Sequence, residues 1–294
     1  MTRRHDTVSF LSDYGLDDEF VGVVHAVIRD LAPQARVIDL THGITPCDIR
    51  AGSLALARSI AWVPEGVVLA VVDPGVGSSR RGIAVEVAGG AGVLVGPDNG
   101  LLAPAVAMAG GADRAVELSN AEFHLEAAAA TFDGRDVFAP VAAHLCNGVD
   151  LTALGPEVDP ALLMPATIPL PRAVDEANPD AGVVAEVMWV DRFGNCQLNV
   201  GPDDLPPLWD THLRVTLPDP DDVSATVTRA VSAVGHFAAV GAGIGLVLDA
   251  YGMFALCCDR RSAAEELHLG VGDQVTISPG DAPEPVATPV SFTR

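Results

Sequence analysis

The sequence predicts an α/β fold: an N-terminal, mainly parallel sheet with flanking helices, followed by a smaller C-terminal β domain. In the first half of the chain, short apolar runs alternate with segments of helical periodicity. A stretch rich in proline and acidic residues then interrupts this pattern. Beyond it, strand-like runs are separated by glycine, proline and aspartate, which is typical of a small β-sandwich or barrel. We therefore expect domains at 1–155 and 182–294, joined by a linker at 156–181.

Each expected element rests on a local pattern. The run at 66–72 is apolar throughout, as in a strand buried on both faces of a sheet. The helix at 18–31 opens with acidic residues, which suit a helix N-terminus. The other strands expected in the first half are 7–11, 36–40, 82–87 and 92–95, and the other helices are 48–62 and 136–146. In the second half we expect strands at 183–190, 213–217, 226–230, 245–248 and 274–277.

The charge balance narrows the range of partners. The 294 residues carry a formal net charge of -22, and such a surface repels phosphate backbones and anionic lipids. We therefore expect no nucleic acid and no membrane partner, whereas a cationic small molecule is compatible. The basic residues are all arginine, so Schiff-base lysine chemistry and a P-loop are excluded.

The cysteines indicate neither a metal centre nor a disulfide framework. Their number is odd, and no spacing matches a zinc site. No signal peptide and no long apolar span are recognisable. We expect reduced cysteines in a cytoplasmic protein without a bound metal. The residues concerned are Cys47, Cys146, Cys196, Cys257 and Cys258.

Three polar side chains directly follow expected strands: Asp13, Asp73 and Asn99. Ligands of open parallel sheets bind beyond the carboxyl ends of the strands, so these residues could converge on one pocket. The alternative is that each belongs to an ordinary turn, because Asp-Gly and Pro-Gly pairs favour turns. The glycine-rich segment 75–81 does not fit a nicotinamide dehydrogenase, since it follows a central strand and leads into another strand.

Other candidates lie in turns further along the chain. Asp133 follows Thr131 and Phe132 at an expected helix start, where it could instead be a simple helix cap. In the second domain, segment 190–195 combines an acid, an aromatic ring and an amide, which can together bind a purine. A hairpin turn would explain the same residues. His42, after the second strand, is a weaker site candidate.

Taken together and in this order, these segments resemble the S-adenosylmethionine hydrolase/halogenase family. The resemblance covers nearly the whole chain. It rests on segments 12–15 with Asp18, 45–48, 73–77, 96–101, 132–138, 193–195 and 251–252. It implies an N-terminal α/β domain, a C-terminal β-barrel-like domain and a homotrimer whose sites lie between subunits.

The resemblance also implies a reaction and residue roles. Water would displace methionine from the ribose 5′ carbon of S-adenosyl-L-methionine (SAM) and form adenosine, without a cofactor. Asp13 would bind the ribose hydroxyls, and Asp18 and Asp191 the methionine ammonium. The adenine would lie between Phe193 and Tyr251, and its edge would be read by Asn195. Further candidates for substrate binding are Asn99, Thr131 and Phe132.

The residues expected to activate the water are Asp73 and Arg80. In the hydrolase branch a histidine completes this set, whereas this chain has Asp133 at that position. Either Asp133 is a substitute proton acceptor, or the chain has a low reaction rate, an altered activity or no activity. A non-catalytic protein that binds SAM or adenosine is therefore an alternative.

Halogenation is a second alternative. The fluorinase branch has Tyr where this chain has Asp73, and it has Thr and Ser, both used around fluoride, where this chain has Val76 and Gly134. An ionised Asp73 would repel a halide, so water is the expected nucleophile.

Overall fold

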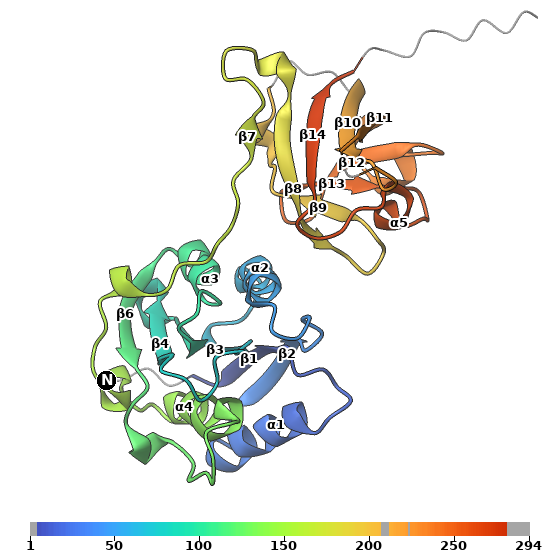
Figure 1. Ribbon diagram of the computed structural model, residues 1–294. Coiled ribbons are helices and arrows are strands. Elements are labelled where there is room, and N and C mark those ends of the chain that lie inside the picture. Colours follow the sequence, from blue (N-terminus) through green and yellow to red (C-terminus); the bar gives the residue numbers. More distant parts are fainter. Residues whose placement is uncertain (1–4, 207–211, 223, 281–294) are drawn as a thin grey trace, which may run out of the picture. The chain divides into compact units, whose positions relative to one another are not determined.

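The computed structural model describes residues 5–206, 212–222 and 224–280. The chain divides into two compact units, Met1–Ile168 and Pro169–Arg294 (Figure 1). None of the helices in these described stretches has both the length and the apolar character needed to span a bilayer.

The first unit is built on a 6-stranded sheet with the order β2-β1-β3-β5-β4-β6. Strands β2, β1, β3 and β5 run parallel, whereas β4 is antiparallel to both β5 and β6. The central strands β1 and β3 are buried along their whole length, as their apolar sequences predict. The bounds are β1 (Thr7–Ser12), β2 (Arg36–Thr41), β3 (Gly66–Val71), β4 (Gly82–Val87), β5 (Gly92–Pro97) and β6 (Ala112–Glu117).

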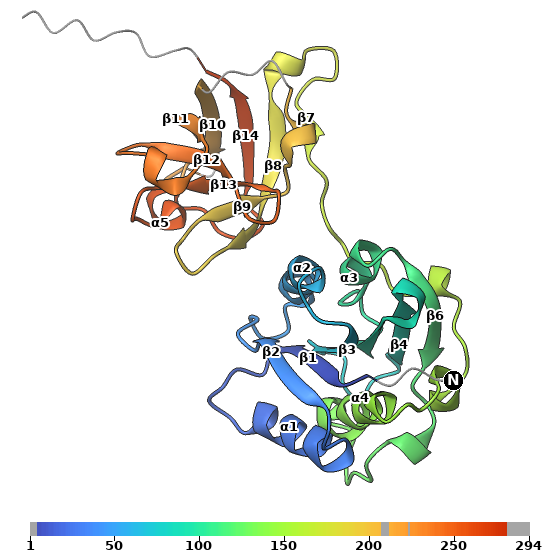
Figure 2. The ribbon, with the colours of Figure 1, turned by 180° about the vertical axis from the view of Figure 1, so that it is seen from behind.

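Helices cover both faces of this sheet. Figures 1 and 2 show α1 and α4 on one face and α2 and α3 on the other. The side chain of Asp48 caps α2 by accepting a hydrogen bond from the backbone N–H of Ala51. The bounds are α1 (Phe20–Leu31), α2 (Ile49–Ile60), α3 (Ala103–Met108) and α4 (Ala139–Cys146), with the π-helical turn η3 (Gly134–Phe138) leading into α4. The predicted mainly parallel sheet with flanking helices is confirmed.

The second unit is a closed barrel of seven strands. Its sheet order is β14-β10-β11-β12-β13-β9-β8, and pairing of β14 with β8 closes the ring. The short β7 pairs antiparallel with the first two residues of β8. The barrel expected for the C-terminal part is therefore confirmed. The bounds are β7 (Arg172–Ala173), β8 (Val183–Val190), β9 (Cys196–Leu198), β10 (His212–Pro218), β11 (Thr226–Val234), β12 (Ile244–Leu248), β13 (Phe254–Cys257) and β14 (Gln274–Pro279), with helix α5 (Ala263–Leu267).

The segment expected to be a linker is partly attached to the first unit. Glu157 forms a β-bridge with Val116 of β6. Further along, the backbone N–H of Met164 donates to Asp98, 2.8 Å away, and Asp98 also pairs with Arg81. Short 3-10 turns complete the chain: η1 (Ala88–Gly90), η2 (Ala121–Phe123), η4 (Leu151–Leu154), η5 (Pro160–Leu162), η6 (Pro179–Ala181), η7 (Pro202–Asp204) and η8 (Phe237–Ala239).

Candidate functional site

A pocket of about 150 Å³ opens at the carboxyl ends of β1 and β3. Asp13 follows β1 directly, and Asp73 stands two residues after the end of β3. The segment that leads into η3 contributes further lining residues. Two of the three residues that follow strands thus share one pocket, as expected for a parallel sheet. The lining residues are Asp13, Tyr14, Phe20, Val71, Asp73, Val76, Thr131, Phe132, Asp133 and Gly134.

Asp73, Arg80 and Asp133 form one ion-paired group at this pocket. The Nε of Arg80 donates to one oxygen of Asp73 at 3.0 Å, and Nη2 donates to the other oxygen. The same Nη2 donates to Asp133 at 2.7 Å. The side chains are 10%, 6% and 19% exposed for Arg80, Asp73 and Asp133. A guanidinium therefore holds two carboxylates in an environment with little water, where electrostatic interactions are strong.

The pKa of Asp73 lies above its ordinary value. Burial raises it most, the charge and hydrogen bonds of Arg80 lower it, and the nearby Asp133 raises it again. Arg80 contacts both carboxylates, and the effect of burial on the pKa of Asp73 nevertheless outweighs that of Arg80. Asp73 is consequently a better proton acceptor than an ordinary aspartate.

Asp133 does not cap the helix that it precedes. It occupies the N-cap position of η3, but its side chain makes no capping hydrogen bond. The carboxylate instead contacts Arg80. The alternative of a simple helix cap is therefore wrong for Asp133, and the side chain belongs to the pocket.

Asp13 is held by the segment between β2 and α2. One of its carboxylate oxygens accepts a hydrogen bond of 2.8 Å from the backbone N–H of Cys47. Cys47 adopts a φ of 66°, which turns the chain sharply just before α2 begins. An ionised carboxylate accepts several hydrogen bonds, so Asp13 retains acceptor capacity toward the pocket.

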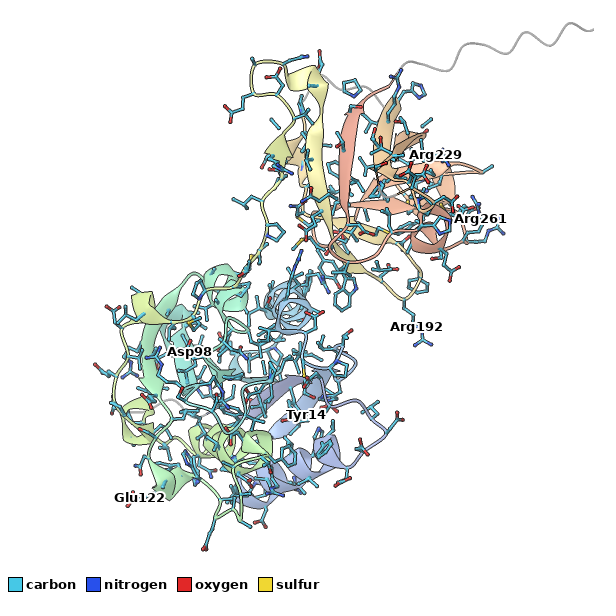
Figure 3. The ribbon with its side chains drawn as sticks, viewed as in Figure 1. Tyr14, Asp98, Glu122, Arg192, Arg229 and Arg261 are labelled. Atoms are coloured by element: carbon cyan, nitrogen blue, oxygen red, sulfur yellow. The ribbon has the colours of Figure 1, made fainter. Side chains whose placement is uncertain are left out.

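Aromatic rings form the remaining wall, and Tyr14 and Phe20 were not among the predicted site residues. Tyr14 packs edge-on against Phe132 with 5.6 Å between ring centroids, and Phe20 packs against Phe132 at 5.2 Å. Burial, followed by the charges of Asp13, Asp73 and Asp133, raises the pKa of Tyr14, so its hydroxyl remains protonated. Tyr14, labelled in Figure 3, directly follows Asp13 in the sequence, and this adjacency could have identified it as a site residue.

Three predicted residues of this unit are not among the residues that line the pocket: Arg80, which contacts it through Asp73 and Asp133, and Asn99 and Asp18. The side-chain amide of Asn99 donates to the backbone of Val72 at 2.9 Å and accepts from Leu101 at 3.1 Å. Asn99 thus ties the segment after β5 to the end of β3. Asp18 is exposed in the loop before α1. Their roles toward a substrate stay predictions.

In the barrel, a turn between β8 and β9 carries three predicted residues. Asp191 accepts hydrogen bonds from the backbone of Phe193 at 2.8 Å and from the backbone and side chain of Asn195 at 2.9 and 2.8 Å. The hairpin turn considered as the alternative is therefore present. Phe193 lies in it and is 79% exposed. Figure 3 shows Arg192 projecting outward from the same turn.

A second turn, between β12 and β13, has the same construction. Asp249 accepts from the backbone of Tyr251 at 2.8 Å and of Met253 at 3.1 Å. Its other oxygen accepts a hydrogen bond from the side chain of Gln197 in β9, which joins this turn to the neighbouring strand. Tyr251 is 54% exposed.

Phe193 and Asn195 line a separate pocket of about 500 Å³ in the barrel unit. Both polar and aromatic groups face this hollow, which suits a flat heteroaromatic ligand. Sequence reasoning did not identify the other lining residues, because they come from separate turns. They are Phe237, Cys258, Asp259, Arg260, Arg261 and Ser262.

Comparison with known proteins defines the family. Residues 8–155 match the SAM hydroxide adenosyltransferase N-terminal domain, and residues 185–276 match the C-terminal domain. The chain belongs to the SAM hydroxide adenosyltransferase family. A relative in this family, the (R)-S-adenosyl-L-methionine hydrolase of Salinispora tropica, is 43% identical over 93% of this chain and 98% of its own length.

More distant similarities are found among curated proteins and among solved structures. The fluorinase of Nocardia brasiliensis is 26% identical, over 94% of this chain and 98% of its own length. Among solved structures, an uncharacterized conserved protein from Thermotoga maritima has a TM-score of 0.81 and 31% identity, covering 92% of this chain and 99% of that one. Both pockets described above lie mainly within segments that match this SAM hydroxide adenosyltransferase family.

Proposed function

We propose that this chain hydrolyses S-adenosyl-L-methionine to adenosine and L-methionine. The observation that carries the proposal is the Asp73–Arg80–Asp133 group, whose two carboxylates line the same pocket as Asp13. The names of the hydrolase relatives support the same substrate and reaction.

The reaction is a substitution at the 5′ carbon of the ribose. The water oxygen forms a bond to C5′ while the C5′–S bond breaks, and its electron pair goes to sulfur. The sulfonium thereby becomes the neutral thioether of methionine, so the leaving group needs no acid. One proton of the water passes to Asp73, whose raised pKa favours acceptance, and then to solvent. Arg80 stabilises the developing hydroxide character, and Asp133 is a second acceptor held by Arg80.

The substrate is held by groups that match its charges. Asp13 accepts hydrogen bonds from the two ribose hydroxyls, and Asp18 and Asp191 bind the methionine ammonium. Phe193 and Tyr251 flank the adenine and Asn195 reads its edge, while Asn99, Thr131 and Phe132 complete the contacts. No cofactor is required, because the sulfonium itself activates C5′. The free cysteines suit a reducing cytoplasm.

Water is preferred to halide because of Asp73. Its buried carboxylate, when ionised, repels a halide at the attacking position but can orient a water molecule. Val76, which also lines the pocket, offers no hydroxyl to a halide ion.

The direct test is incubation of the purified protein with SAM in the presence of a chelator, followed by chromatography. Adenosine and L-methionine are expected in equal amounts, with no 5′-halo-nucleoside in chloride or fluoride. Binding of SAM without any product would instead identify a non-catalytic binder. Turnover that requires a divalent ion would contradict the proposed mechanism.

A homotrimer is proposed as the working unit, with each site shared between the first unit of one subunit and the barrel of the next. The support is that the pocket of about 150 Å³ is small for SAM, whereas adenine-binding candidates lie in the barrel. Light scattering at micromolar concentration is expected to give three times the chain mass of 30.3 kDa. A monomer with full activity would contradict the shared site.

A further inference from the structure

A cluster of metal-ligating side chains lies outside the pocket described above. His25 comes from α1, Asp39 from β2 and His42 from the segment just after β2. The Nε2 of His25 lies 2.8 Å from Oδ1 of Asp39, and the Nε2 of His42 lies 3.0 Å from the same oxygen. The ligand atoms of the three residues all lie within 4.8 Å of one another.

His42 is fixed with Nε2 directed at this cluster. Its side chain is 3% exposed, and Nδ1 lies 2.7 Å from the hydroxyl of Ser12. The ring also packs edge-on against Phe10, with 4.6 Å between centroids. Nε2 is buried and, although it lies 3.0 Å from Asp39, its direction is unsuitable for a hydrogen bond to Asp39 or to any other residue of the described part of the chain. A buried imidazole nitrogen without a hydrogen bond needs a partner of some kind.

Asp39 supplies the carboxylate of the cluster, and the same oxygen, Oδ1, contacts both imidazole rings. Asp39 and His25 are 43% and 35% exposed, so one side of the cluster faces solvent.

We propose that His25, Asp39 and His42 form a binding site for a divalent transition-metal ion of the zinc type, with its remaining position open to water. Two imidazoles and a carboxylate are a ligand set that such ions accept. Tetrahedral ligands of zinc are roughly 3.3 Å apart at ordinary bond lengths, so the observed 2.8 and 3.0 Å require only a small outward movement.

The contact between His42 Nδ1 and the Ser12 hydroxyl is of the kind that orients histidine ligands in metal sites. A ligating histidine normally donates its other ring N–H to a fixed acceptor, which sets the tautomer. The Ser12 hydroxyl is in place to accept from Nδ1 and leave Nε2 free for a metal. Hard cations such as Mg²⁺ prefer oxygen ligands and should be rejected. This site is independent of the proposed hydrolysis, since none of its residues lines that pocket.

The test is calorimetric titration of the whole chain, first stripped with chelator, with zinc chloride. We expect one zinc ion per chain and a higher melting temperature, whereas Mg²⁺ has no comparable effect. His25→Ala and Asp39→Asn, which change partly exposed residues, should each lower zinc affinity by at least about 10- to 100-fold. Asp30→Asn, at an exposed position of α1 outside the cluster, is the matched control and should bind as the parent does.

Two results would overturn the proposal. If the parent binds no zinc at micromolar concentration, the cluster is only a hydrogen-bonded ion group. If His25→Ala and Asp39→Asn bind zinc as tightly as Asp30→Asn, the metal lies elsewhere. Because binding and melting are measured without SAM, neither result depends on whether the chain hydrolyses it.

Discussion

Replacing Arg80 with methionine is expected to lower the turnover of SAM by about 100- to 1,000-fold, the usual effect of removing one preorganised donor at a reaction centre. Arg80 makes charged hydrogen bonds to both Asp73 and Asp133. Without it, two buried carboxylates remain close together with no counter-charge. Single-turnover kinetics would separate this chemical effect from substrate binding.

The pH profile of the same variant provides a second readout. Arg80 lowers the pKa of Asp73, while burial and Asp133 raise it. Loss of Arg80 therefore raises this pKa further, and more Asp73 is protonated at neutral pH. Since the proposed base must be ionised, the acidic limb of the rate profile should move to higher pH.

Arg81→Met is the matched control, because Arg81 is the neighbouring residue and pairs with Asp98 outside the pocket. It should change stability without moving the pH profile. An Arg80→Met variant that keeps parental turnover, or loses turnover with an unshifted profile, would exclude Arg80 from activation of the water.

Asp13→Ala should weaken the binding of adenosine by at least about 100-fold. Two hydrogen bonds to a charged acceptor are lost, each worth roughly 1.5–3 kcal/mol, and about 1.4 kcal/mol corresponds to a tenfold change. Calorimetry with adenosine measures the affinity, and thermal unfolding shows whether the loss of the Cys47 contact disturbs the fold.

The controls for this experiment lie in the same segment. Asp17→Ala changes an exposed neighbour and should leave adenosine affinity unchanged. Asp13→Asn keeps an acceptor for Cys47 but removes the charge, so its affinity should lie between those of the parent and Asp13→Ala. Parental affinity in Asp13→Ala would remove Asp13 from the nucleoside site.

The sequence predicted long apolar elements better than short or polar ones. The strands at β1 and β3 stand out because every residue of each is buried. Edge strand β6 was missed because charged residues such as Asp113 and Arg114 interrupt its apolar pattern. Strands β9 and β13 were missed because three or four residues are too few to show a period.

The part of the candidate site that is formed by residues just after strands could be predicted from the sequence. Asp13 and Asp73 meet because parallel strands place their carboxyl ends at one edge of the sheet. The contact of Arg80 with Asp133 was not predictable from spacing, since 53 residues separate them in sequence. The cluster of His25, Asp39 and His42 joins a helix to the end of a strand, and of these residues only His42, directly after β2, stood out in the sequence.

Gly134 lies where the pocket wall has no room for a side chain. A Cβ atom at this position would lie 2.0 Å from the hydroxyl of Tyr14 and 3.2 Å from the ring of Phe132. The fluorinase branch that this sequence resembles has a serine here, so a single Gly134→Ser change in the present background meets a steric clash before it can offer a hydroxyl to a halide. Tyr14 would have to move first. The effect of Gly134→Ser therefore depends on whether the Tyr14 side chain can shift, so the two positions constrain each other.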